Sequence, residues 1–359
     1  MVPVNTGIGE FHGSILKGQR MTTVISKRIR KVRMNPAQGD HIARLIPIEG
    51  PSHDEPAYRL LEGDVVKAVK VTEVSEAGSV PHVKITNMLD ARLFLVDGQE
   101  LIGAKQNRML NTDVLVPAGA TLNVPVSCIE AGRWRYTAAD FSAGKAASYR
   151  VRRRKSRRVH ESLRRAGRHD ADQHEVWQEV DEELAQAKAS SRTSALRDAY
   201  AARQKELVEF RRKLKIPPQA VGMAVFCGTE FRGLDLFDRH TTLRYFWESL
   251  VDSYAIDWLG RPVEMGSTGP PQIENETISR VLNQAAEASW ESFESPGEGQ
   301  DYRLATTTLN GSALVWDEQV VLHLQLFPHD PKDDEQSARR RRPRRPLRRH
   351  ARFTDTAFT

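Results

Sequence analysis

The sequence predicts an α+β fold with an antiparallel β-rich core, flanking helices and a long charged helical insertion. Short segments with alternating apolar residues occur in both halves of the chain, for example at 122–128 and 319–327, and a period of two is typical of half-buried strands. Residues 170–215 contain neither Gly nor Pro, and their apolar residues recur at helical spacing. These observations favour antiparallel strands with helices packed beside them.

The first half of the chain consists of short strands behind an irregular start. Residues 1–40 show no sustained period, and we expect a flexible, basic N-terminal extension. The pair Asp97-Gly98 tolerates the positive φ angles of a tight turn, and this predicts a hairpin between the strands on either side of it. The strands predicted in this half are 43–48, 65–74, 83–89, 93–96, 101–102, 114–116 and 122–128.

A charged helical insertion is predicted at 145–216. An apolar stripe with alternating steps of four and three runs from Leu196 to Leu214, and an earlier stripe begins at Trp177. The polar residues between the two stripes leave open one long helix or a helical hairpin. Pro217-Pro218 ends the segment, because proline has no amide hydrogen to donate.

The second half of the domain returns to strands. We expect a loop through Asp235 and Asp238, with Asp238 as a candidate N-cap of the next helix, and a hairpin that turns at Asn310-Gly311. The predicted elements are a strand at 221–226, helices at 241–259 and 276–290, and strands at 302–309, 312–316 and 319–327. Residues 41–330 thus form an α+β domain. The Arg/Pro-rich tail at 331–359 buries too little apolar surface to offset its ordering entropy, so we expect disorder there.

The formal charge of +6 is unevenly distributed. Three segments are strongly basic: the net charge is +6 over residues 1–39, +9 over 150–168 and +9 over 339–352. The rest of the chain therefore has a net charge of −18. The body is therefore acidic, and the basic segments are candidates for non-specific nucleic-acid binding. The two cysteines, Cys128 and Cys227, form no CxxC motif, which excludes a disulfide framework and a zinc motif. No apolar stretch is long enough to span a membrane and no signal peptide is visible, so we expect a cytoplasmic protein.

The densest group of chemically capable residues lies between two apolar strands, at 100–108. Lys105 and Arg108 carry charge that suits a phosphate, and the amides of Gln106 and Asn107 would orient a hydrogen-bonding ligand. The alternative is a solvated loop with structural salt bridges. The sequence identifies no metal site and no cofactor.

Five further residues are candidates for the same site. Glu100 and Glu130 would activate water as a general base if the fold brings them beside the ligand. Trp134 beside Arg133 would stack on a base or sugar, or else cover an edge of the core. His323 lies on a strand, where a histidine is either a site residue or a hydrogen-bonded bystander.

Five blocks of the chain resemble motifs of the ARG and rhodanese-phosphatase-superfamily-associated protein domain family, namely 93–108, 114–117, 126–134, 234–238 and 321–324. The resemblance covers roughly 41–330 in scattered blocks. The family name implies association with ADP-ribosylglycohydrolases and phosphatases, and hence a role around NAD or ADP-ribose metabolism, without an established reaction. The residues that the resemblance marks are Glu100, Lys105, Gln106, Asn107, Arg108, Glu130, Arg133 and Trp134.

Three functions follow as hypotheses. The leading one is a pocket that binds or hydrolyses a nucleotide or ADP-ribose-related ligand, in which Lys105 and Arg108 engage phosphate; as an enzyme it would be a hydrolase. The second is a non-enzymatic module that contacts a protein partner through the helical insertion. The third is non-specific nucleic-acid binding through the basic arms.

Overall fold

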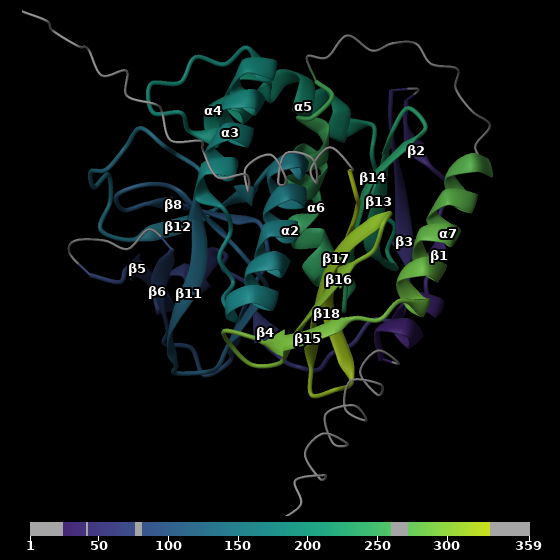
Figure 1. Ribbon diagram of the computed structural model, residues 1–359, viewed down its shortest axis with the longest axis horizontal. Helices are drawn as coiled ribbons and strands as arrows, with labels where there is room; N and C mark the ends of the chain where they lie inside the picture. Colours follow the sequence, from purple (N-terminus) through teal and green to yellow (C-terminus); the bar gives the residue numbers. More distant parts are fainter. Residues whose placement is uncertain (1–23, 41, 76–80, 260–271, 331–359) are drawn as a thin grey trace, which may run out of the picture. The chain divides into compact units, whose positions relative to one another are not determined.

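The computed structural model describes residues 24–40, 42–75, 81–259 and 272–330. Strands dominate the described chain up to residue 146, helices occupy most of 149–212, and helices and strands mix from 220 onward (Figure 1). The described residues up to His329 belong to one structural unit. The predicted α+β fold is confirmed.

The largest sheet has nine strands in the order β1-β3-β13-β14-β18-β17-β16-β15, with β2 also paired to β3. It joins the start of the described chain to its C-terminal half, since Leu45 on β3 opposes Val225 on β13. All of its pairings are antiparallel. Its strands are β1 (Arg33–Met34), β2 (Gln38–Gly39), β3 (Ala43–Glu49), β13 (Ala220–Cys227), β14 (Glu230–Phe237), β15 (Glu291–Glu294), β16 (Gln300–Ala305), β17 (Leu309–Trp316) and β18 (Val320–Pro328).

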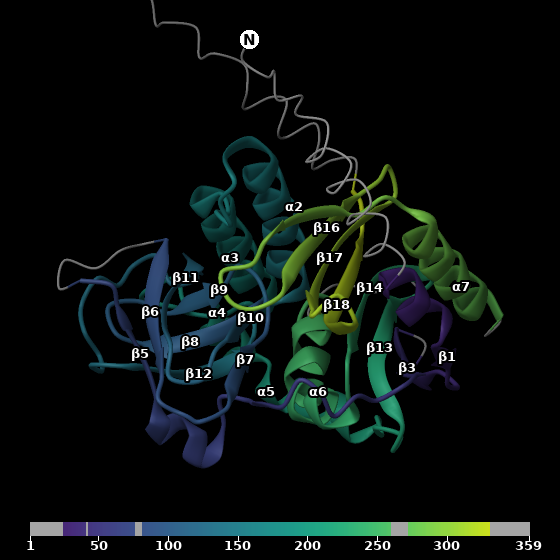
Figure 2. The same cartoon turned by 90° about the horizontal axis from the view of Figure 1, so that it is seen from below.

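Two smaller sheets are built from the intervening strands, and Figure 2 shows them grouped on the side away from α7. One has the order β10-β7-β4 and the other β12-β8-β9-β11-β6-β5. Only β4 and β7 pair in parallel among the strands that the structure describes. The strands are β4 (Tyr58–Arg59), β5 (Val69–Glu73), β6 (His82–Asn87), β7 (Arg92–Leu95), β8 (Gln99–Gly103), β9 (Arg108–Leu110), β10 (Val114–Val116), β11 (Thr121–Cys128) and β12 (Phe141–Ala146).

The helices have clear local signals at their ends. Asp172 caps helix α3 (Gln173–Ala187), because its side chain accepts the backbone N–H groups of His174 and Glu175. Gly167 ends helix α2 (Tyr149–Ala166) in the left-handed conformation. Residues 24–30 are also helical. The remaining bounds are η1 (Gly63–Ala68), α4 (Leu196–Ala202), α5 (Gln204–Arg212), α6 (His240–Ala255) and α7 (Gln272–Glu287).

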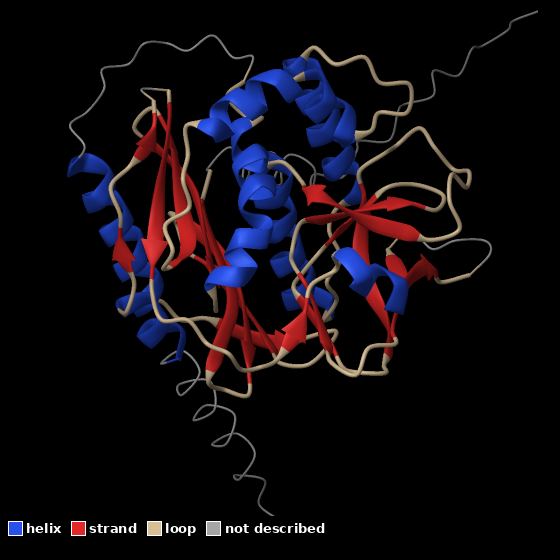
Figure 3. Ribbon diagram, turned by 180° about the vertical axis from the view of Figure 1, so that it is seen from behind, coloured by secondary structure: helices blue, strands red, loops and turns tan. Residues whose placement is uncertain are grey.

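The nine-stranded sheet is covered on both faces. Leu45 and Met223 belong to a core shared with α2 to α6, whereas Ile46 and Ala224 belong to a core shared with helix 24–30 and α7. Neighbouring residues of a strand face opposite sides of its sheet, so this assignment follows from the period of two. A third core fills the smaller sheets. Figure 3 shows a central group of blue helices between the large sheet and the smaller ones, and further blue helices on the outer side of the large sheet.

Both predicted hairpins need correction. A turn does form at Asp97-Gly98, with Gly98 at φ 81°, but the strands beside it belong to different sheets: β7 pairs with β10 and β4, and β8 with β9 and β12. Asn310-Gly311 lies inside β17 opposite Ala305 and Leu304, and the β16–β17 hairpin turns at 306–308 instead. The turn preference of Asp97-Gly98 is realised between strands of different sheets, whereas at Asn310-Gly311 tertiary pairing overrides the local preference.

Three other predictions change. The predicted loop through Asp235 is strand β14, whose buried carboxylate interrupts the apolar pattern. Residues 65–68 lie in the 3₁₀ helix η1, so the strand predicted from 65 begins only at Val69. The predicted single helix or hairpin at 170–215 is three helices, α3, α4 and α5, with a break at Arg203.

Candidate functional site

The loop between β8 and β9 carries three of the nine predicted site residues, and Glu100 and Arg108 lie on the two strands that it connects. Arg133 holds this loop in place: its guanidinium donates to the carbonyl oxygens of Gly103 at 3.2 Å and Ala104 at 2.7 Å, and to Asn107 Oδ1 at 3.0 Å. Asn107 Oδ1 also accepts the N–H of Gly103 at 3.2 Å. Arg133 and Asn107 are therefore occupied in shaping the loop.

Glu130 belongs to the same framework. Its carboxylate accepts hydrogen bonds from Arg133 at 2.6 Å, from the backbone N–H of Asn107 at 3.1 Å and from the Thr193 hydroxyl at 2.8 Å. Burial opposes ionisation of Glu130, but these donors hold its pKa below the usual value. A carboxylate with three fixed donors is a poor general base.

Arg108 lies fully buried beneath the loop. It donates to Gln106 Oε1 at 2.7 Å and contacts the sulfur of Cys128, and its Nη2 lies 3.6 Å from Glu73 Oε1. Its Nε has no hydrogen-bond partner among the described residues. Burial raises the pKa of Cys128 to about 11, so this thiol stays protonated at neutral pH.

Glu100 faces the other side of the sheet. Leu101 pairs directly with Arg108 across β8 and β9, so these two side chains share a face and Glu100 points to the opposite one. Glu100 is buried, and burial raises its pKa to about 7. The structure therefore does not bring Glu100 to the face that carries Arg108.

An exposed cluster, which we call the aromatic-lysine face, covers the outer side of the loop. The Lys105 ammonium lies 5.4 Å from the ring centroid of Trp134 and 5.2 Å from that of Tyr136, and Arg108 lies 5.6 Å from the Trp134 ring. Trp134 is 49% exposed and Tyr136 51%. Sequence reasoning missed Tyr136, although it follows Trp134 by two residues.

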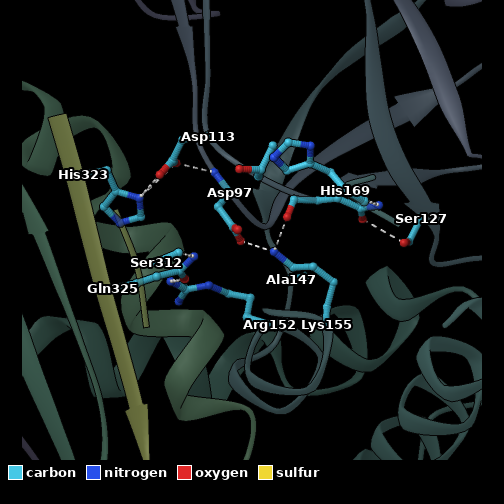
Figure 4. A network of polar contacts seen from close by, with 12 residues as sticks. Asp97, Asp113, Ser127, Ala147, Arg152, Lys155, His169, Ser312, His323 and Gln325 are labelled. Carbon is cyan, nitrogen blue, oxygen red and sulfur yellow. Dashed lines mark hydrogen bonds and ion pairs between the residues drawn. The ribbon is translucent and has the colours of Figure 1, made fainter. Parts of the chain in front are cut away.

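A second group of polar residues, the buried charge network, lies between the β7–β8 turn, α2 and the nine-stranded sheet (Figure 4). Lys155 on α2 forms an ion pair with Asp97 and donates to the carbonyl oxygen of Asn111 at 3.1 Å. Arg152, one turn earlier, forms an ion pair with Asp235 on β14. These four charged side chains are at most 2% exposed.

His323 completes the network from β18. Its Nδ1 lies 3.0 Å from a carboxylate oxygen of Asp113, and its Nε2 lies 3.3 Å from one of Asp235. Burial works against the imidazolium, but the two carboxylates raise the pKa of His323 to about 9. Burial likewise opposes ionisation of Asp235, but Arg152 and His323 lower its pKa to about 2. His323 is therefore protonated at neutral pH and bridges two carboxylates.

The network places part of the basic segment at 150–168, which the sequence makes a candidate for nucleic-acid binding, inside the core of the domain. Burial lowers the pKa of Lys155 to about 8, and Asp97 opposes this shift. At least eight of the ten basic residues of the segment have a carboxylate within 4.0 Å. No sequence signal distinguishes the buried cations from the exposed ones, because Arg and Lys are usually exposed.

Asp238 does not cap a helix as predicted. It accepts hydrogen bonds from Tyr58 at 2.7 Å and Arg239 at 2.8 Å, while α6 starts after Arg239 without a side-chain cap. The described part of the chain contains no group of three or more His, Cys, Asp or Glu residues that would hold a metal ion. None of its helices is long and apolar enough to cross a membrane.

Comparison with known families gives one match. The profile of the ARG and Rhodanese-Phosphatase-superfamily-associated Protein domain matches residues 32–327, which is most of the chain. The match includes the loop between β8 and β9, all of α2 and His323. No curated protein and no solved structure matches the chain significantly.

Proposed function

This chain belongs to the ARG and Rhodanese-Phosphatase-superfamily-associated Protein domain family, and from that premise we propose that it binds a nucleotide or ADP-ribose derivative at the aromatic-lysine face. The observation that carries the proposal is the exposure of Trp134 and Tyr136, whose ring centroids lie 5.4 and 5.2 Å from the Lys105 ammonium. Exposed aromatic rings stack on bases, and a neighbouring ammonium engages phosphate.

The support beneath this face favours recognition of an anion. Arg108 lies buried 5.6 Å from the Trp134 ring, where Glu73 partly offsets its charge and the exposed cluster keeps the ammonium of Lys105. Because Arg133 fixes the carbonyl groups of Gly103 and Ala104, the loop that carries Lys105 is ordered before any ligand arrives, and such preorganisation lowers the entropic cost of binding. Lys105 and Trp134 therefore take the binding roles, while Gln106, Asn107 and Arg133 maintain the loop.

The two carboxylates argue for binding rather than hydrolysis. Glu130 is held by three hydrogen-bond donors, and Glu100 points away from the face that carries Arg108. Neither lies free beside the aromatic rings to activate water, as a general base must. We therefore propose a binding domain for this class of ligand.

The contacts of the helical insertion weigh against the two alternative functions. The apolar stripe that would meet a protein partner, including Tyr200, Leu207 and Phe210, is buried in the core of the chain itself. The cations of 150–168 are largely paired with carboxylates, which leaves few of them to release counterions from nucleic acid. The Arg-rich tail lies outside the described residues.

Isothermal titration calorimetry of the full chain with ADP-ribose, NAD, AMP, adenosine and ribose 5-phosphate tests the proposal. We expect Trp134→Ala to weaken binding of the adenine-containing ligands by about 1–3 kcal/mol, the usual contribution of one stacked base. Lys105→Met should weaken binding of the phosphorylated ligands and leave adenosine unaffected.

Matched variants elsewhere on the surface serve as controls. Met88→Ala removes a side chain that is 50% exposed, and Lys70→Met removes an exposed ammonium from β5. Both should bind like the wild-type chain. The proposal fails if no ligand of the series binds, or if the variants at Trp134 and Lys105 bind as tightly as these controls.

A further inference from the structure

A separate cavity of about 300 Å³ lies between helix 24–30, the segment at 51–53 and the β17–β18 turn. Its lining includes Lys27, Arg28, Lys31 and His53, with Glu318 as an acidic lining residue. The volume is at the lower end of the range of small-molecule pockets. The cavity shares no residue with the aromatic-lysine face or with the buried charge network.

The buried cation in this cavity is Arg28. Its side chain is 5% exposed and donates to the carbonyl oxygens of Pro51 and Phe237, but no carboxylate among the described residues lies within the 4.0 Å of an ion pair. Its Nε has no hydrogen-bond partner there either. The nearby Asp238 is hydrogen-bonded to Tyr58 and Arg239 instead. A buried cation without an ion-pair partner is costly unless an anion joins it.

The surroundings are electropositive as well. Burial lowers the pKa of His53, and Arg28, Arg239 and Lys31 lower it further, while Asp54 acts in the opposite direction. The lining contains one acidic side chain, that of Glu318, and the three basic side chains of Lys27, Arg28 and Lys31. The balance favours an anion over a cation or a neutral ligand.

We propose that this cavity is a second ligand site that binds a phosphate group, with Arg28 at its base and Lys27, Lys31 and His53 around the phosphate oxygens. Arginine donates two parallel hydrogen bonds to phosphate, and lysines at the mouth add charge that attracts the dianion. The cavity accommodates a free phosphate or a small phosphate ester. Since different side chains form the two sites, binding here does not depend on the aromatic-lysine face.

Titration of the full chain with inorganic phosphate at constant ionic strength tests this proposal, with the His53 imidazole followed by NMR. Phosphate should saturate the site and raise the pKa of His53, because a bound dianion offsets the nearby cations. Chloride at equal ionic strength should not. Ribose 5-phosphate compared with inorganic phosphate distinguishes a phosphate ester from free phosphate, since tighter binding of the ester identifies an ester as the ligand. Ribose, which lacks the phosphate, should not bind.

Charge-matched double variants locate the binding. Lys27→Gln with Lys31→Gln changes two exposed side chains and should weaken phosphate binding at least about tenfold, while Lys70→Gln with Lys205→Gln, an equal change of charge on β5 and α5, should not. Trp134→Ala should retain phosphate binding here even if it abolishes nucleotide binding. Equal effects of chloride and phosphate, or equal losses in both double variants, would overturn the proposal.

Discussion

The imidazolium of His323 makes the stability of the fold depend on pH in a defined window. Its pKa rises from 6.5 to about 9 on folding, a difference that corresponds to about 3 kcal/mol at about 1.4 kcal/mol per pH unit. Below pH 6.5 the imidazole is protonated in the folded and the unfolded chain, and the full contribution is present. As pH rises toward 9, only the folded chain keeps the proton, so this contribution is lost.

Substitution of His323 by Gln isolates the effect. Between pH 6.5 and 8, about 2 kcal/mol of the His323 contribution should disappear from the wild-type chain and none from His323→Gln. The free-energy difference between the two proteins should therefore be largest near pH 6 and shrink by about that amount at pH 8. Other titrating groups, such as Glu100 with its pKa of about 7, are present in both proteins and cancel.

Urea denaturation followed by tryptophan fluorescence, at half-unit steps from pH 6 to pH 8, measures this difference. His174→Gln is the control, because His174 is exposed on α3 and should leave the pH profile unchanged. If His323→Gln does not fold, Asp113→Asn removes one of the two carboxylates and should reduce the same slope. A wild-type-to-variant difference that stays constant across this range would refute the assignment of a protonated His323.

Three further predictions concern other parts of the molecule. Cys128, whose pKa is about 11, should resist iodoacetamide in the native chain at pH 8 while the less buried Cys227 reacts; mass spectrometry before and after denaturation checks this, and rapid native alkylation of Cys128 would contradict it. Arg133→Met should accelerate amide hydrogen exchange in the loop 103–107 more than in β11, because the loop loses the guanidinium that binds its carbonyl oxygens. An equal change of the exchange rate in the loop and in β11 would show that Arg133 does not order the loop. Phe210→Ala should lower the free energy of unfolding by about 3–5 kcal/mol, since Phe210 is buried and packs edge-on against Trp258 at 5.4 Å; a loss below about 1 kcal/mol in urea denaturation would mean that α5 packs loosely.

Local periodicity predicted much of the fold. Segments such as 122–128 alternate because one face of each strand meets a core, and the stripe from Leu196 to Leu214 recurs at helical spacing for the same reason. What periodicity does not contain is the identity of the partner strand. Asp97-Gly98 and Asn310-Gly311 both have turn-forming residues, but one separates two sheets and the other lies inside a strand.

The sequence groups candidate site residues only where they are close together along the chain. Lys105, Gln106 and Arg108 come together because they belong to one short loop and strand. The alternation of β8 places Glu100 on the face opposite to Leu101 and Arg108. Lys155 reaches Asp97 across 58 residues, and no local pattern of charges specifies so distant a partner.

The position of α2 has a consequence for any attempt to shorten the protein. Residues 150–168 look like a removable appendage of the domain, but their deletion would leave Asp97 buried without the cation of Lys155 and Asp235 with the His323 imidazolium but without Arg152. An unpaired buried carboxylate costs several kcal/mol or takes up a proton. A shortened chain would therefore need a neutral residue at position 97, because the buried cations of α2 supply positive charge inside an otherwise acidic body.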